Sequence, residues 1–209
     1  METDEPSDFA DDQRPNLRSR GRCFVYVLPC AYEDILKLGM SRDPLARMQT
    51  LHHRYFEFFD LERALLIETE TVRDARRLEL ALGGRIEAHN APAPLVVREQ
   101  AGGHTEWYRG AFERLQDAAT DLARTGYVVH TPAHAWLRSR LIASSDHLYP
   151  WSNETLLAIE SNAIPAEVDR HLQGLLRDAL DAYSAFEIDL EPLLPVAVWR
   201  WLSVQQKLP

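Results

Sequence analysis

The sequence predicts an α+β fold: a small three-stranded antiparallel sheet flanked by helices, followed by a mostly α-helical C-terminal subdomain. Two β-rich runs, at 23–28 and 35–40, are joined by a connection short enough for a hairpin. A third β-rich run follows at 61–69. After Gly126 the apolar residues recur mostly at helical spacing, which predicts a change from sheet to helices.

Capping residues mark where the helices of the first half begin. Asp43 can cap a first helix, and Pro44 suits its first position. Thr71 and Asp74 form a capping box that opens a second helix. Glu106 is expected in the first turn of a third helix, with a direct role in a site as the alternative. Further helices are expected near 133–143, 153–162, 165–184 and 195–206.

These patterns divide the chain into three segments. Residues 1–20 are polar, acidic and without periodicity, which predicts a disordered tail. Residues 21–126 hold the predicted sheet and its helices, and are close to neutral in charge. Residues 127–209 are expected to form a helical subdomain of unknown role, through which a protein partner or a second copy of the chain could bind.

Composition excludes several classes of protein. Of 209 residues, 45% are hydrophobic and 26% charged, which is typical of a folded protein. No apolar run reaches the roughly 20 residues that span a bilayer, and the acidic N-terminus does not resemble a secretory signal. We therefore expect a cytoplasmic protein with no membrane partner. Cys23 and Cys30 are too few for a disulfide framework, so we expect both thiols to be reduced.

The charge balance limits how the protein could hold nucleic acid. The formal net charge of −9 argues against broad electrostatic capture of a polyanion. Lys37 and Lys207 are the only lysines, so nearly all the basic residues are arginines. Arginine makes bidentate contacts with phosphate better than lysine does, although a GC-rich genome also explains the bias.

Glu79 stands out because of where a helix would place it. Ala75, Leu82 and Ile86 form the apolar stripe of the second helix, and Glu79 lies on or beside that stripe. A buried carboxylate needs a cation, a metal ion or strong hydrogen-bond donors. The alternative is a glutamate at the edge of the stripe that reaches solvent or pairs with an arginine.

Three more residues in this segment have an ordinary structural explanation when each is taken alone. Tyr26 alternates with apolar neighbours on the first strand and could be a core tyrosine. Lys37, within the second strand, could be an exposed strand lysine. Arg47, on the first helix, could be a surface arginine.

Taken together, these residues resemble the GIY-YIG nuclease superfamily. The resemblance begins at 24–26, continues through Lys37-Leu38-Gly39, and includes Arg47 and Glu79. It closes at 106–108 and covers about residues 22–125. The chain is most similar to the phage and bacterial branch with Lys-Ile-Gly in the second motif (T5orf172-like).

The resemblance implies metal-dependent hydrolysis of phosphodiester bonds in DNA. Glu79 would hold one divalent cation, Mg²⁺ or Mn²⁺, and Arg47 would bind a phosphate oxygen. Tyr26 would orient or deprotonate the attacking water, helped by a cation such as Lys37 that lowers its pKa. The resemblance therefore requires Tyr26, Lys37, Arg47 and Glu79 to converge in one cleft.

Some positions depart from the family pattern. Lys37 replaces the second tyrosine of the family name, which puts a mechanism with two tyrosines in question. Many members carry a histidine shortly after the arginine, and here His52 or His53 could take that place. The alternative is that His52 and His53 are an ordinary pair of surface histidines. Asn90 is a further polar candidate near the site.

The sequence leaves three functions open. The first is an endonuclease that acts on DNA with Mg²⁺ or Mn²⁺. The second is a nucleic-acid-binding module with this fold and little catalysis, which the negative net charge and Lys37 favour. The third is a protein-interaction adaptor that acts through residues 127–209.

Overall fold

The computed structural model describes residues 20–97, 104–161 and 165–205. The strands are β1 (Arg20–Pro29), β2 (Ile35–Ser41), β3 (Leu65–Thr71), β4 (Asn90–Ala91), β5 (Trp107–Arg109) and β6 (Val129–His130). The helices of the first half are α1 (Pro44–Leu51), α2 (Tyr55–Phe58), α3 (Val72–Arg85), η2 (Glu87–His89) and α4 (Phe112–Arg124). The second half contains α5 (His134–Ala143), η4 (Ser145–His147), α6 (Leu148–Glu160), α7 (Ala166–Ala185), η5 (Glu191–Leu193) and α8 (Val196–Gln205).

The sheet has six strands in the order β4-β5-β2-β1-β3-β6, and every neighbouring pair is antiparallel. The mixed α+β class is confirmed, whereas the expectation of three strands is wrong. The sequence predicts no strand at β4 or β5, whereas 127–130 suggests a short strand and β6 lies within it; all three contain only two or three residues each. Strands this short show no alternation in the sequence, so only tertiary pairing reveals β4 and β5.

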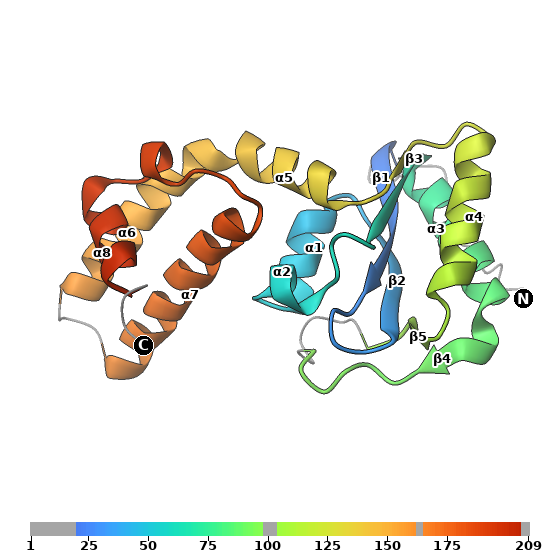
Figure 1. Ribbon diagram of the computed structural model, residues 1–209, viewed down its shortest axis with the longest axis horizontal. Coiled ribbons are helices and arrows are strands. Elements are labelled where there is room, and N and C mark those ends of the chain that lie inside the picture. Colours follow the sequence, from blue (N-terminus) through green and yellow to red (C-terminus); the bar gives the residue numbers. More distant parts are fainter. Residues whose placement is uncertain (1–19, 98–103, 162–164, 206–209) are drawn as a thin grey trace, which may run out of the picture.

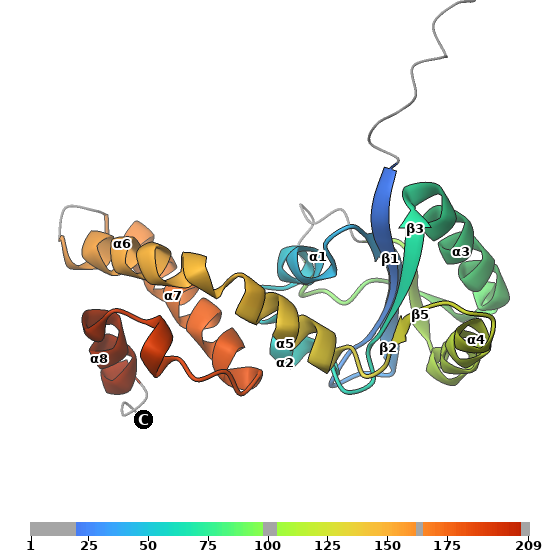
Figure 2. The same ribbon diagram turned by 90° about the horizontal axis from the view of Figure 1, so that it is seen from above.

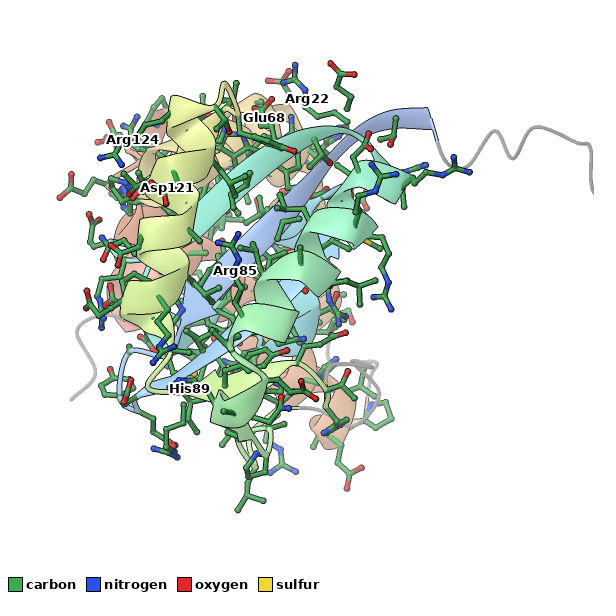
Figure 3. All side chains as sticks on the ribbon, turned by 90° about the vertical axis from the view of Figure 1, so that its right-hand side faces the viewer. Arg22, Glu68, Arg85, His89, Asp121 and Arg124 are labelled. Atoms are coloured by element: carbon green, nitrogen blue, oxygen red, sulfur yellow. The ribbon has the colours of Figure 1, made fainter. Side chains whose placement is uncertain are left out.

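Helices cover both faces of the sheet. Helices α1 and α2 lie on one face, and α3 and α4 lie on the other (Figures 1 and 2). The alternation of β1 explains the two cores, since Tyr26 and Leu28 join the first core while Val25 and Val27 join the second. Figure 3 looks onto the second face, with Arg22 and Glu68 at one end of the strands and His89 at the other.

Side-chain caps start the two helices that flank the site. The Asp43 carboxylate accepts a hydrogen bond from the Ala46 backbone at 3.1 Å, and α1 follows at Pro44. The Thr71 hydroxyl accepts one from the Asp74 backbone at 3.1 Å at the start of α3. Both predicted caps are confirmed.

The expected place of Glu106 is wrong. Helix α4 begins only at Phe112, and Glu106 precedes strand β5 instead. Its φ of 62° lies in the left-handed region, which a residue with a side chain rarely adopts. A turn and a short strand therefore separate this carboxylate from the helix.

The C-terminal helices share a core with the sheet. Buried side chains of α5, α6, α7 and α8 belong to the same cluster as Tyr26 and Leu28 of β1. Arg54 ties the two halves together by donating to Asp178 at 2.7 Å and Asp181 at 2.9 Å. The chain past residue 126 also supplies β6, which pairs with β3.

Three further expectations concerned the N-terminal tail, the two cysteines and membrane-spanning helices. The expected disordered tail lies outside the described residues up to residue 19, and β1 begins at Arg20. Cys23 and Cys30 are both free and buried. Among the helices of the described ranges, none combines the length and the apolar character needed to cross a lipid bilayer.

Candidate active site

The phenol of Tyr26 lies across a glycine of the neighbouring strand. Tyr26 of β1 is opposite Gly39 of β2 in the ladder. A Cβ at position 39 would lie 2.6 Å from the Tyr26 Cζ and closer still to the hydroxyl oxygen. Glycine is thus required for the ring to lie flat on the strand, because any side chain at this position would displace it.

Arg47 reaches the same phenol from α1. Its Nε donates to the Tyr26 hydroxyl at 3.4 Å. Burial raises the pKa of Tyr26, which is 2% exposed, and the hydrogen bond and charge of Arg47 lower it only in part. Tyr26 is therefore a neutral phenol at neutral pH. The expectation that Lys37 lowers this pKa is wrong, since Arg47 is the cation in contact.

The Lys37 side chain is buried and binds three acceptors on two segments of the chain. Its ammonium group is 1% exposed and donates to the carbonyls of Leu38 at 2.9 Å and Thr105 at 2.8 Å. The third donation goes to Glu106 Oε2 at 3.1 Å. These three bonds use all three ammonium protons. Lys37 is therefore not the exposed strand lysine of the simpler interpretation, and it fixes the 105–106 segment against β2.

Glu79 is buried on the inner side of α3, as the apolar stripe predicts. Its Oε2 accepts a hydrogen bond from Arg76 Nη1 at 2.7 Å. Burial raises the pKa of Glu79, Arg76 lowers it in part, and the charge of Glu106 raises it further. The carboxylate is therefore buried and does not reach solvent, and it pairs with an arginine, as the alternative interpretation expected.

Glu106 connects the two groups of charged residues. Its Oε2 bonds to Lys37, and its Oε1 lies 4.0 Å from Arg76 Nη1. A polar chain therefore runs from Glu79 through Arg76 and Glu106 to Lys37. Lys37 and Gly39 are two apart on β2, so this chain ends on the face that carries Tyr26.

The expectation that Tyr26, Lys37, Arg47 and Glu79 converge in one cleft is wrong, because the site lies around the edge of the sheet and not on one face. Helix α3 covers the face opposite to Tyr26, so Glu79 and Tyr26 approach from different sides. Strand β5 pairs with β2 only over Ile35–Lys37, and within the described residues no strand continues this edge past Lys37. The charges of Glu79 and Glu106 still act on Tyr26 and raise its pKa, as expected for groups that meet around this edge.

A hollow opens beside Glu79 on the α3 side of the edge. Its volume is about 270 Å³. Besides Glu79 and Glu106, it is lined by Asn90, Glu87 and Tyr108, together with backbone and apolar groups of α3 and β2. Asn90 of β4 thus lies beside Glu79, as the sequence suggested. Its polar lining includes three carboxylates, one amide and one phenol.

The oxygen atoms available at this site are the type of ligand that a magnesium ion prefers. Mg²⁺ prefers oxygen ligands and is commonly held by one or two carboxylates while it keeps several waters. Glu79 and Glu106 offer such oxygens, and Arg76 is the one hydrogen-bond partner of Glu79 among the described residues. Within these residues no group of three His, Cys, Asp or Glu side chains could form a complete metal cage. The arrangement suits an ion that completes its shell with water and substrate.

The structure does not bring His52 to this cluster. Its ring stacks on Phe58 and on His53, and its Nδ1 accepts from the Arg54 backbone at 3.2 Å. His52 is the C-cap of α1, so the chain there already turns toward α2. His53 lies 3.7 Å from Asp178 of α7, in the contact between the two halves.

Comparison with known proteins adds one finding. Residues 23–123 match the T5orf172 domain. The match covers just under half of the chain and includes Tyr26, Lys37, Arg47, Glu79 and Glu106. The T5orf172 family is associated with GIY-YIG-like, nuclease-type domains. No curated protein and no solved structure matches the chain at a significant level.

Two residues of the T5orf172-like part were not predicted as members of the site: Arg76 was not singled out, and a site role for Glu106 was only the alternative. Arg76 precedes Glu79 by three residues, and this spacing on a helix is the signal for the pair. For Glu106 the signal was its place at the end of the resemblance, at 106–108, which does not indicate its partner. Its link to Lys37 spans a long stretch of chain and depends on how β5 pairs with β2.

Proposed function

We propose that this protein is a divalent-metal-dependent endonuclease that hydrolyses phosphodiester bonds in DNA. The observation that carries the proposal is that Arg47 bonds to Tyr26 across from Gly39 while the charge of Glu79 acts on the same phenol, within a segment similar to the T5orf172 domain. A buried carboxylate beside an arginine and a tyrosine is a combination that suits phosphoryl chemistry.

Glu79 is the proposed ligand for the metal ion. Its burial keeps the carboxylate in one place, and its Oε1 carries no hydrogen bond from a described residue. When bound, a divalent cation would neutralise charge that builds on the phosphate and on the leaving oxygen. Lys37 supports this arrangement as a positioning residue, because it holds Glu106 beside the ion pair of Glu79.

Tyr26 and Arg47 act on the opposite side of the edge. Since burial keeps the phenol neutral, Tyr26 orients the attacking water through a hydrogen bond and does not deprotonate it. The Arg47 guanidinium is half-buried and already directed at the Tyr26 hydroxyl, so it can bind a phosphate oxygen next to that water. The two side chains thereby place water and phosphate relative to each other.

Two exposed arginines provide a route for the DNA backbone. Arg42 follows β2, and Arg73 lies one turn before Arg76 on α3. Among the described residues neither forms an ion pair. Arg42 follows directly on Ser41, which pairs with Phe24 of β1, so it lies at the end of β2 that is reached after Gly39. In a protein of net charge −9, this local patch is where phosphates would bind.

A binding module without catalysis is the second candidate. The observation that favours it is that Lys37 uses all its donors internally and that Glu79 is already paired with Arg76. In that case Arg42, Arg47 and Arg73 would hold DNA, and no bond would break.

Nicking of a supercoiled plasmid separates the two functions. We expect nicking by the wild-type protein with Mg²⁺ or Mn²⁺ and none with EDTA. Tyr26→Phe should nick about 100-fold more slowly with nearly unchanged DNA affinity. Tyr149→Phe, in the exposed part of α6, is the matched control and should behave as wild type. DNA binding without nicking under any metal would instead support the binding module.

A further inference from the structure

Arg76 forms an ion pair with the carboxylate that would bind the proposed metal ion. Its Nη1 lies 2.7 Å from Glu79 Oε2 and 4.0 Å from Glu106 Oε1. The guanidinium is thus the cation that lies between the two carboxylates of the site. A divalent ion held by Glu79 would have to share this place with a positive charge.

The two side chains of this ion pair differ in how freely they can move. The Glu79 side chain is 6% exposed and lies among the buried residues of α3, whereas the Arg76 side chain is 53% exposed. Arginine has several rotatable bonds, and an exposed guanidinium can turn into solvent at little cost. The carboxylate therefore stays in place while the guanidinium can leave.

We propose that Arg76 is a gate for cation binding, whose guanidinium occupies Glu79 until a divalent ion displaces it. This inference rests on the proposed function, because it takes Glu79 as the metal ligand. Glu79, Glu106, Lys37 and Arg76 together are neutral when the pairs are closed. Removing the Arg76 charge leaves one unbalanced carboxylate, which attracts a cation more strongly.

DNA gives the displaced guanidinium a second place to bind. Arg73 lies one turn before Arg76 on the same side of α3, so both arginines can reach a backbone that follows this helix. A phosphate that binds Arg76 removes it from Glu79 and so favours the metal. Metal and DNA should consequently strengthen each other's binding, and the site should hold little metal before DNA arrives.

The test is a titration of the full chain with Mn²⁺ at pH 8, in which the free ion is measured by electron paramagnetic resonance. Arg76→Gln should bind Mn²⁺ about tenfold more tightly than wild type, because a repelling charge next to the ion is gone. Arg76→Lys, which keeps that charge, should stay close to wild type. Arg77→Gln is the matched control, since it removes an exposed arginine one residue away that has no ion pair among the described residues. It should change the affinity by less than about twofold.

The outcomes separate this inference from the proposed function. Equal or weaker binding by Arg76→Gln, with binding still lost in Glu79→Gln, would overturn the gate and leave Glu79 as the ligand. Unchanged binding in Glu79→Gln would show that the ion lies elsewhere, and both proposals would fail. Circular dichroism of each variant would show that the fold is kept.

Discussion

Tyr26 and Gly39 face each other across two antiparallel strands, with the phenol lying on the glycine where a Cβ would be. The missing side chain lets the hydroxyl reach Arg47 from α1. It also leaves this position of β2 without a side chain, close to where the charges of Glu79 and Glu106 act on Tyr26. The glycine of the second motif therefore matters for the site as well as for the strand.

Gly39→Ala should destabilise the protein and disable the site. The new methyl group would overlap the Tyr26 ring, which is itself buried, so ring and strand must shift apart. Overpacking of this kind costs about 1–3 kcal/mol in the free energy of unfolding. Urea denaturation measures the loss. Gly174→Ala is the control, because no atom lies within 4 Å of its Cβ position in α7, and it should stabilise by about 0.5–1 kcal/mol. Equal effects of the two substitutions would contradict the close contact.

Glu79→Gln should make the protein more stable at neutral pH and above. Burial raises the pKa of Glu79 in the folded state, so the folded protein binds its proton more tightly than the unfolded chain does. Stability from this group is present below the ordinary carboxyl pKa of 4.5 and is lost as pH rises through the raised value. The amide carries no charge and avoids that loss. Thermal unfolding from pH 4 to pH 8 should show the advantage of the variant growing with pH, and a constant difference would argue against a buried charge.

Lys37→Met should cost stability because it leaves acceptors without a donor. The carbonyls of Leu38 and Thr105 would lose their charged partner, at about 1–3 kcal/mol in total. Glu106→Gln keeps an oxygen for Lys37 and lies partly in solvent, so it should cost less than about 1 kcal/mol. Urea denaturation of both variants compares the two contributions. A larger loss for Glu106→Gln would mean that the ion pair, and not the carbonyl bonds, explains why the lysine is buried.

Arg54→Ala should loosen the contact between the two halves of the chain. Arg54 is partly buried and bonds to Asp178 and Asp181 of α7, so its loss leaves two carboxylates close together. We expect a loss of about 1–2 kcal/mol and faster proteolysis within α7. Arg124→Ala removes an exposed pair with Asp121 and should have no measurable effect. Similar behaviour of the two variants would show that Arg54 contributes no more than a surface ion pair.

The sequence predicted the parts of the fold that depend on local patterns. The hairpin of β1 and β2 and the caps Asp43 and Thr71 each follow from a few neighbouring residues. The burial of Glu79 follows from helical spacing in the same way. Strands β4 and β5 could not be predicted, since their pairing joins distant segments through only two or three residues.

The limits of local patterns also explain the errors within the site and in α7. Nothing near Lys37 in the chain shows that its ammonium group is buried against Thr105 and Glu106. In the helix of 166–185, helical spacing predicts a core-facing stripe made of Val168, Leu172, Leu175, Ala179 and Tyr183. In the structure Leu176 is buried and Leu175 is 40% exposed. The stripe that contains Leu175 and the one that contains Leu176 both have helical spacing. Only the packing of α7 in the folded chain, above all against α6, decides which of the two is buried.

The role of Glu79 as the metal ligand is tested by the rate of plasmid nicking by Glu79→Gln across a Mg²⁺ titration, measured together with DNA affinity. We predict that Glu79→Gln keeps the fold and binds DNA at least as well as wild type, because one negative charge near phosphate is gone. Nicking should be nearly lost at every Mg²⁺ concentration, since the ligand for the ion is removed. Glu87→Gln, which changes another carboxylate lining the same hollow, should nick as wild type does. Undiminished nicking by Glu79→Gln would contradict the central claim.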